Sequence, residues 1–129
     1  MSEKSVVSSP DAPPAIGPYS QGIKAGGFVF LSGQIPLVGD TNRMVFGMIK
    51  EQTEQVLTNV TALLAAEGLD MNDVVKATVF LASMTEFSAM NEVYARHFPG
   101  VPPARSTIEV ARLPRDARVE IEVIAKLRD

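Results

Sequence analysis

Hydrophobic and polar residues alternate in the first part of the chain, and this pattern predicts a β-hairpin. Residues 19–24 and 28–32 have the composition of strands, and the Ala-Gly-Gly at 25–27 supplies glycines that tolerate the positive φ of a hairpin turn. Residues 1–14 are polar and rich in proline. Most of this arm is therefore expected to be loop, although the Ser-Val-Val at 5–7 fits a short edge strand.

Helical spacing begins after a second predicted turn at residues 39–42. From about Met48 the apolar residues recur with the period of an amphipathic helix, and they are Ile49, Val56, Leu57, Val60, Leu63 and Leu64. Gly68 is expected to end this helix, because glycine commonly follows a helix C-terminus. Residues 74–82 are almost all apolar or β-branched, which predicts a strand buried on both faces.

A second helix is predicted to begin with Thr85 as its N-cap and to end before Pro99 and Gly100. Its apolar stripe consists of Phe87, Met90, Tyr94 and Phe98. Residues 105–110 and 119–125 then have the alternation of strands. One face of the first of these strands carries Arg105, Thr107 and Glu109. We expect Glu120 and Glu122, on the second strand, to share a polar face with Arg105.

These elements predict an α+β fold in one domain, residues 1–129, with a mixed sheet of five or six strands and two helices on one face. The other face is expected to carry Val29, Leu31 and Ile124. An apolar face of that size is too large for a monomer to leave exposed. We therefore expect the protein to form an oligomer through its sheet.

The composition narrows the classes of function. Of the 129 residues, 46% are hydrophobic and 21% are charged, as in ordinary globular domains. The net charge of −3 and the scattered Lys and Arg argue against nucleic acid as a partner. No apolar stretch is long enough to span a membrane, and there is no cysteine. The sequence thus predicts a soluble, cytoplasmic protein with neither nucleic-acid nor membrane partners.

Few residues suit metal-assisted or covalent chemistry. The single histidine, His97, lies in the last turn of the second predicted helix, where a positive ring favours the helix dipole. With no cysteine, one histidine and no spaced carboxylate cluster, neither a metal site nor a Ser-His-Asp triad is expected.

Three other candidates each allow two interpretations. Glu120 and Glu122 form either a buried acid or a solvated polar face. Asn91 hydrogen-bonds either a substrate or a neighbouring loop carbonyl. Gly33 follows a strand directly, and it allows either close approach of a ligand to the backbone or a bulge.

Arg105 is the strongest candidate for a binding residue. It follows two prolines, and this stiff backbone makes its guanidinium a preorganised bidentate receptor for a carboxylate. The alternative is an ion pair within the chain, with Glu109 or Glu120. The residues alone leave these two hypotheses equal and predict no more than a small carboxylate-binding domain.

Three segments add a resemblance to a known family: AIGPYSQGI at 15–23, FLSGQIP at 30–36 and PPARSTIEVARLPRDARVEIEVIA at 102–125. From about residue 9 to the C-terminus the chain resembles the reactive-intermediate deaminase family, also called Rid or YjgF, and within it the RidA-type enamine/imine deaminases. The resemblance implies a chorismate-mutase-like fold. It also implies a homotrimer around a central barrel, with a site in each cleft between subunits.

The implied reaction is hydrolysis of 2-aminoacrylate, 2-iminopropanoate or 2-iminobutanoate to a 2-keto acid and ammonia, without a cofactor. The catalytic residues implied by the resemblance are Arg105, Glu120 and Tyr19. Arg105 is expected to hold the substrate carboxylate, Glu120 to position or deprotonate a water, and Tyr19 to pack over the substrate. The substrate-binding residues are Arg105, Ser32, Gly33, Asn91 and Thr107. Thr107 occupies a position where bacterial relatives often carry cysteine, which affects the expected substrate preference.

Two other functions compete with the deaminase. A non-catalytic trimer could bind small carboxylates or act as a chaperone or regulator, but such a protein needs Arg105 and not the water-activating Glu120. Ribonuclease activity is attributed to some relatives, and the acidic balance argues against it here.

Overall fold

The computed structural model describes residues 3–129 apart from the side chain of Asp40, so residues 1 and 2 of the predicted N-terminal arm lie outside the described residues. The strands are β1 (Ser5–Val7), β2 (Gly22–Ala25), β3 (Phe28–Leu31), β4 (Leu37–Val38), β5 (Arg43–Met44), β6 (Val74–Leu81), β7 (Ala104–Glu109) and β8 (Val119–Lys126). The α-helices are α1 (Ile49–Ala65) and α2 (Phe87–His97).

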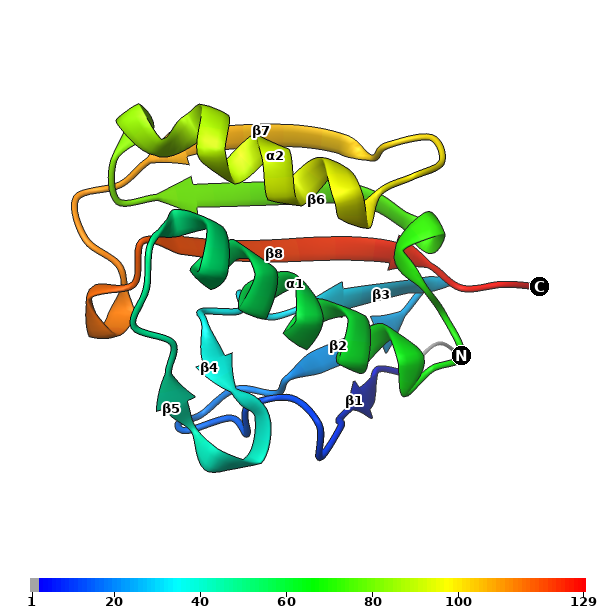
Figure 1. The fold of residues 1–129 in the computed structure, drawn as a ribbon. Coiled ribbons are helices and arrows are strands. Elements are labelled where there is room, and N and C mark those ends of the chain that lie inside the picture. The colour runs from blue at the N-terminus through cyan, green and yellow to red at the C-terminus, as the bar shows by residue number, and fades with distance from the viewer. Residues whose placement is uncertain (1–2) are drawn as a thin grey trace.

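Within residues 3–129, six strands form one sheet in the order β1-β2-β3-β8-β6-β7, and β4 pairs with β5 in a separate small hairpin. Neighbouring strands of the large sheet are antiparallel except β6 and β7. These two are parallel because α2 connects them as a crossover. Figure 1 shows α1 and α2 together on one face of the sheet. The predicted α+β fold with two helices on one face is therefore confirmed.

The core lies between the two helices and the covered face of the sheet. The predicted stripe of α1 is buried, with Val56, Leu57, Val60, Leu63 and Leu64 fully inaccessible to solvent. These side chains pack in one cluster with the inward residues of β8, which are Val119, Ile121, Val123 and Ala125. Gly68 follows α1 with a φ of 72°, so a left-handed residue ends the helix as predicted.

The predicted hairpin is confirmed in β2 and β3. Gly26 and Gly27 form the turn with φ values of 60° and 86°, which residues with a side chain adopt only at a cost. The predicted edge strand at residues 5–7 is β1, which pairs with β2. No helix in the described residues combines the length and the apolar character needed to cross a membrane.

The face assigned to β3 is wrong. Val29 and Leu31 face the helices and are 0% and 5% exposed, whereas Phe28 and Phe30 lie on the open face. Phe30 pairs there with Ile124, which is on the open face as predicted. All residues of β3 are apolar, so their alternation carries no information about which set is buried.

The N-cap predicted for the second helix is also wrong. A short 3₁₀ turn at Met84–Glu86 precedes α2, and the Ser83 side chain caps this turn by accepting a hydrogen bond from the Thr85 backbone N–H at 3.3 Å. The extra turn delays the start of α2 to Phe87. The apolar stripe of the helix is nevertheless buried at Met90, Tyr94 and Phe98, as predicted.

Candidate functional site

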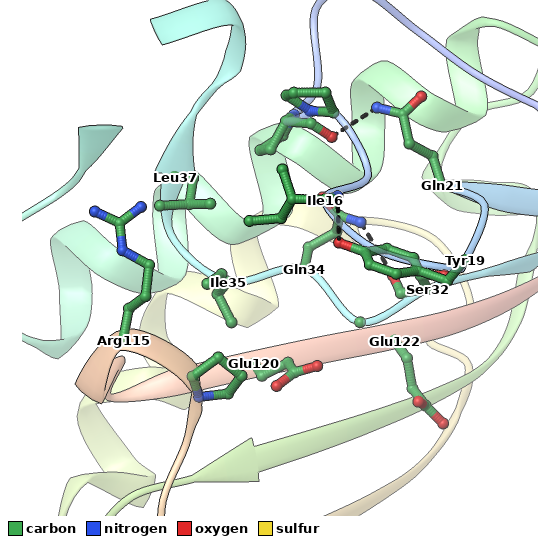
Figure 2. Close-up of a pocket in the computed structure, with 14 residues that line it drawn as sticks. Ile16, Tyr19, Gln21, Ser32, Gln34, Ile35, Leu37, Arg115, Glu120 and Glu122 are labelled. Carbon is green, nitrogen blue, oxygen red and sulfur yellow. Dashed lines mark hydrogen bonds between the residues drawn. The ribbon is translucent and has the colours of Figure 1, made fainter. Parts of the chain in front are cut away.

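A cavity of about 600 Å³ opens beside the end of β8 that carries two glutamates. Four segments form its wall: the N-terminal arm, which in the structure continues to Gln21; the loop after β3 together with Leu37 of β4; the turn before β8; and β8 itself (Figure 2). The lining residues are Pro13, Pro14, Ile16, Tyr19, Gln21, Ser32, Gly33, Gln34, Ile35, Leu37, Pro114, Arg115, Glu120 and Glu122. The structure thus brings together four of the predicted site residues, which are Tyr19, Ser32, Gly33 and Glu120.

The buried Gln21 side chain attaches the N-terminal arm to this cavity. Its Nε2 donates to the Pro13 carbonyl at 2.7 Å, and its Oε1 accepts from the Ser9 backbone N–H at 2.9 Å. Nearby, the Ser32 hydroxyl donates to the Ser20 carbonyl at 2.6 Å, which ties the loop after β3 to the arm. The arm therefore forms a fixed wall that carries Tyr19, whose ring is half exposed.

Glu120 lies on the open face of the sheet, opposite Phe80 in the β6–β8 register. Burial raises the pKa of its carboxyl above the usual range, and the nearby charge of Glu122 raises it further. Gly33 packs directly against this side chain, because a Cβ at Gly33 would collide with the carboxylate and lie 2.8 Å from the Glu120 Cδ. The close neighbour of Gly33 is thus the Glu120 carboxylate, a contact that neither of the two interpretations of Gly33 had named.

Arg105 is in the edge strand β7, and its side chain lies on the face of the sheet that the helices cover, where its guanidinium contacts α2. Its Nη1 donates to the Asn91 Oδ1 at 2.7 Å. Its Cζ lies 4.7 Å from the ring centroid of Tyr94 and 5.5 Å from that of Phe87, so the cation is stacked between two aromatic rings. Within residues 3–129 no ion pair of Arg105 is found, and Glu109 instead accepts a hydrogen bond from the Met84 backbone N–H.

Two buried hydroxyls on this side have no hydrogen-bond partner in the described part of the chain. They belong to Tyr94 and to Thr107, which is two residues after Arg105 on the same face of β7. Burial raises the pKa of the Tyr94 phenol, so this group is neutral at physiological pH. Unpartnered buried hydroxyls are costly, and they suggest a place where a polar ligand or water completes the bonding.

The expectation that Arg105 and Glu120 share a polar face is wrong within one chain. Arg105 of β7 pairs with Ala77 of β6, and the Ala77 side chain points into the core under the helices. Glu120 of β8 pairs with Phe80 of β6. Because Ala77 and Phe80 are three residues apart on one strand, they face opposite sides of the sheet, and so do Arg105 and Glu120. Asn91 and Thr107 lie with Arg105, and none of these three lines the cavity. The predicted residues therefore form two separate groups on opposite faces of the sheet.

Sequence reasoning missed three contributors to these groups. Tyr94 was assigned to the apolar stripe of α2, and nothing in the periodicity marks its hydroxyl as polar and unpartnered. Gln21 and Arg115 line the cavity, and both belong to the segments that carry the family resemblance, which was the available signal. His97 lies at the end of α2 with its Nε2 3.0 Å from the Glu54 carboxylate, and it does not line the cavity.

The structure is thus a small α+β domain with a cavity bounded by two carboxylates and, separately, an arginine without an acid partner among the described side chains. Residues 9–127 match the family model described as Endoribonuclease L-PSP. The chain belongs to this family, the YjgF/Rid family, and the resemblance found in the sequence is confirmed.

Relatives with similar sequences and structures include named deaminases. The chain is 50% identical over 125 residues to Reactive Intermediate Deaminase A, chloroplastic, of Arabidopsis thaliana, covering 97% of this chain and 67% of that protein. It is 48% identical over 124 residues to the 2-iminobutanoate/2-iminopropanoate deaminase of Dermatophagoides farinae, covering 96% and 97%. The crystal structure of E. coli TdcF with bound serine superposes with a TM-score of 0.91 and 40% identity, covering 96% of this chain and 99% of that one.

Proposed function

We propose that this protein hydrolyses 2-imino and 2-enamino acids, such as 2-iminopropanoate, 2-iminobutanoate and 2-aminoacrylate, to 2-keto acids and ammonia. The observation that carries the proposal is the state of Arg105, a half-buried guanidinium with fixed orientation and no acid partner in residues 3–129. Close relatives named as imine deaminases supply the class of reaction. We assign the reaction to the cytoplasm, which the absence of cysteine from the sequence fits.

Arg105 binds the carboxylate of the substrate in this proposal. A guanidinium has five N–H groups, and one of them already donates to Asn91, which fixes the plane of the fork. The remaining groups can donate in parallel to both oxygens of a planar carboxylate. Because Asn91 is neutral, it orients the cation without neutralising the charge that attracts the ligand.

Glu120 acts as the general base. Its raised pKa gives the carboxylate a greater affinity for a proton than an exposed glutamate has, and a base works best when its pKa approaches the working pH. Ionised Glu120 accepts a proton from a water as the water oxygen bonds to the imine carbon. That proton passes to the imine nitrogen, which has taken the C=N π electrons, and a carbinolamine forms. Glu120 then accepts the proton of the new hydroxyl and delivers it to nitrogen, so that the C–N bond breaks, the C=O of the keto acid forms and ammonia leaves.

Three further residues of the cavity, Tyr19, Ser32 and Gly33, orient the substrate. Tyr19 packs over it, and Ser32 with the backbone of Gly33 provides polar contacts next to Glu120. No covalent nucleophile is required, because an imine conjugated with a carboxylate is already electrophilic. Positioning of the imine and the water accounts for the rate increase.

An assembly of identical subunits completes the site. Arg105 and Glu120 point away from opposite faces of one sheet, so a single chain cannot apply both to one small substrate. We place Arg105 of the partner subunit at the mouth of the cavity that contains Glu120, with Asn91 and Thr107 of the partner subunit beside it. The open apolar face, which we define as Phe28, Phe30, Phe80 and Ile124, is the surface we propose to be buried in a homotrimer.

A coupled assay tests the function. A pyridoxal-phosphate-dependent dehydratase generates 2-aminoacrylate from serine, and pyruvate or ammonia release is followed with and without the purified protein. We expect faster release with the wild type. Arg105→Lys keeps the charge and loses the fork, and since a hydrogen bond to a charged group contributes about 1.5–3 kcal/mol, we expect kcat/KM to fall by about tenfold to a hundredfold. Release no faster than in buffer, with 2-keto acids still bound, would instead favour a non-catalytic binding protein.

A further inference from the structure

The cavity beside Glu120 contains an arginine that the proposed reaction does not use. Arg115 lines this cavity at the turn Pro114–Asp116, just before β8. Its Nη1 donates to the Asn42 carbonyl at 3.1 Å, and no ion pair of Arg115 occurs among the side chains that the structure describes. Asp116, the adjacent acid, pairs with Arg112 instead, at 2.8 Å. The Arg115 guanidinium therefore retains unused donors at the wall of the cavity.

The backbone that carries Arg115 is strained. Arg115 has φ 55° and ψ 26°, and Asp116 has a φ of 57°, so two successive residues with side chains adopt the left-handed conformation. This conformation is unfavourable for residues other than glycine, and such strain is concentrated at functional sites. The hydrogen bond to Asn42 holds the strained turn against the segment between β4 and β5. The side chain of Arg115 is thus kept at the cavity by a conformation that the sequence does not favour locally.

The cavity has room for a substrate with a side chain that extends beyond the reacting carbon. Its volume of about 600 Å³ falls in the range of roughly 300–1,000 Å³ that is typical of sites for much larger ligands than 2-iminopropanoate. Figure 2 shows Arg115 and Leu37 on one side of the view and Tyr19 and Ser32 on the other, with Ile35 between them. The two polar ends of the cavity are therefore separated by an apolar stretch.

We infer that Arg115 binds a second carboxylate, so that the site accepts imines of dicarboxylic amino acids with four or five carbons. The inference rests on the proposed function. The first carboxylate of such a substrate binds Arg105 of the partner subunit, the imine carbon lies next to Glu120, and the methylene groups cross the apolar stretch beside Ile35. The second carboxylate then reaches Arg115. The exposed Arg115 cation attracts this anion and donates hydrogen bonds to it, which gives a preference that an apolar side chain does not receive.

The test compares imines generated in the assay by amino-acid oxidases from aspartate or glutamate with those from alanine or 2-aminobutyrate. Their hydrolysis is followed in competition with trapping by semicarbazide. Arg115→Gln should lower kcat/KM for the dicarboxylic imines by about tenfold to a hundredfold and leave the monocarboxylic imines unchanged. Arg43→Gln, which removes an exposed arginine outside the cavity, is the matched control and should change neither.

A binding measurement separates this inference from the proposed function, because it requires no turnover. Calorimetry with 2-ketoglutarate and 2-ketobutyrate should show tighter binding of the dicarboxylate to the wild type and equal binding of the two acids to Arg115→Gln. Equal binding to the wild type overturns the inference even if imines are hydrolysed. A loss that is the same for both substrate classes, or a changed molecular mass of the assembly, also overturns it and makes Arg115 an interface residue. Tighter binding of 2-ketoglutarate without any hydrolysis supports the second-carboxylate site and refutes the deaminase.

Discussion

Glu120 combines two properties that normally oppose each other. Its carboxyl is half-buried beside Gly33 and close to Glu122, and both burial and the second charge disfavour its ionised form. A general base nevertheless has to be ionised when it meets the water. The fold therefore carries a cost at neutral pH to keep a reactive carboxylate at this position.

Glu120→Gln should separate activity from stability. The amide cannot accept the proton, and since general base catalysis contributes about 10²–10⁴-fold, we expect kcat to fall by about a hundredfold or more. The folded pKa of Glu120 is raised above the usual 4.5, so the wild type loses stability as the pH rises from 4.5 through the folded pKa. The variant lacks this loss.

The free energy of unfolding of Glu120→Gln should thus exceed that of the wild type above the folded pKa and match it below about pH 4.5. Denaturant unfolding across this range provides the measurement, and Glu3→Gln, which removes an exposed glutamate outside the cavity, is the control. A stability difference that is the same at all pH values would show that ionisation of Glu120 has no part in it.

The residues of the two candidate groups differ in how far the sequence alone identifies them. Arg105 and Glu120 could be proposed as site residues from the sequence, because their chemical type and their motifs both point to a site. The hydroxyls of Tyr94 and Thr107 could not, because a partner is absent only once the side chains around them are packed. The strain at Arg115 is likewise a property of the folded turn and leaves no sign in residue type.

At the scale of elements, α2 serves as a support for Arg105. Phe87, Asn91 and Tyr94 are spaced by four and three residues, so they lie on one face of the helix, directly over β7. The rings of Phe87 and Tyr94 stack on the guanidinium, and the Asn91 Oδ1 accepts a hydrogen bond at its edge. The cation is consequently ordered before any ligand arrives, which reduces the entropy cost of binding.

Asn91→Asp tests why this support is neutral. The new carboxylate would pair with Arg105, so the variant should unfold at a higher denaturant concentration than the wild type. The same pair competes with the ligand, and we expect the affinity for 2-ketobutyrate to fall by about tenfold, equivalent to about 1.4 kcal/mol. Ser88→Asp adds the same charge at an exposed position of α2 and is the control. Unchanged affinity in Asn91→Asp would mean that Arg105 does not bind the carboxylate.

The elements themselves were largely predictable, and the exceptions have a common cause. Apolar residues recur with a helical period in α1 and at every second position over most of β8, so the buried face of each element follows from its period alone. The Phe-Val-Phe-Leu of β3 has no such contrast, and pairing with β8 decides its face. The short hairpin of β4 and β5 was missed because each strand has too few residues to show a period.

At the scale of the whole molecule, the open apolar face and the divided site point to the same assembly. Phe28 and Phe30 are 36% and 43% exposed, with ring centroids 6.4 Å apart, on the face opposite the helices. Burying this face in an oligomer removes apolar area from water and also allows the two groups of site residues to meet across subunits. In the proposed assembly, oligomerisation and catalysis therefore depend on the same contact.

Mixing two variants of low activity should restore part of the activity if the site is shared. Arg105→Lys subunits retain Glu120, and Glu120→Gln subunits retain Arg105. After joint refolding at equal amounts, a random trimer joins an intact cavity to an intact arginine at about a quarter of its sites, so about a quarter of wild-type activity should return. Each variant refolded alone is the control. Sedimentation equilibrium should give the mass of a trimer, and Phe30→Glu should reduce it.

The separation of Arg105 from Glu120 also affects how a family of related sequences would be interpreted statistically. Correlated substitutions usually identify residues in contact. A correlation between positions 105 and 120 would instead record a contact between chains. Within each chain, Arg105 on β7 and Glu120 on β8 pair with β6 from its two sides, and their side chains lie on opposite faces of the sheet. Forcing such a pair together in a single chain would require one strand to slip by a residue, which would turn its buried side chains to the open face. A coupling that the monomer cannot satisfy would therefore be evidence for the assembly.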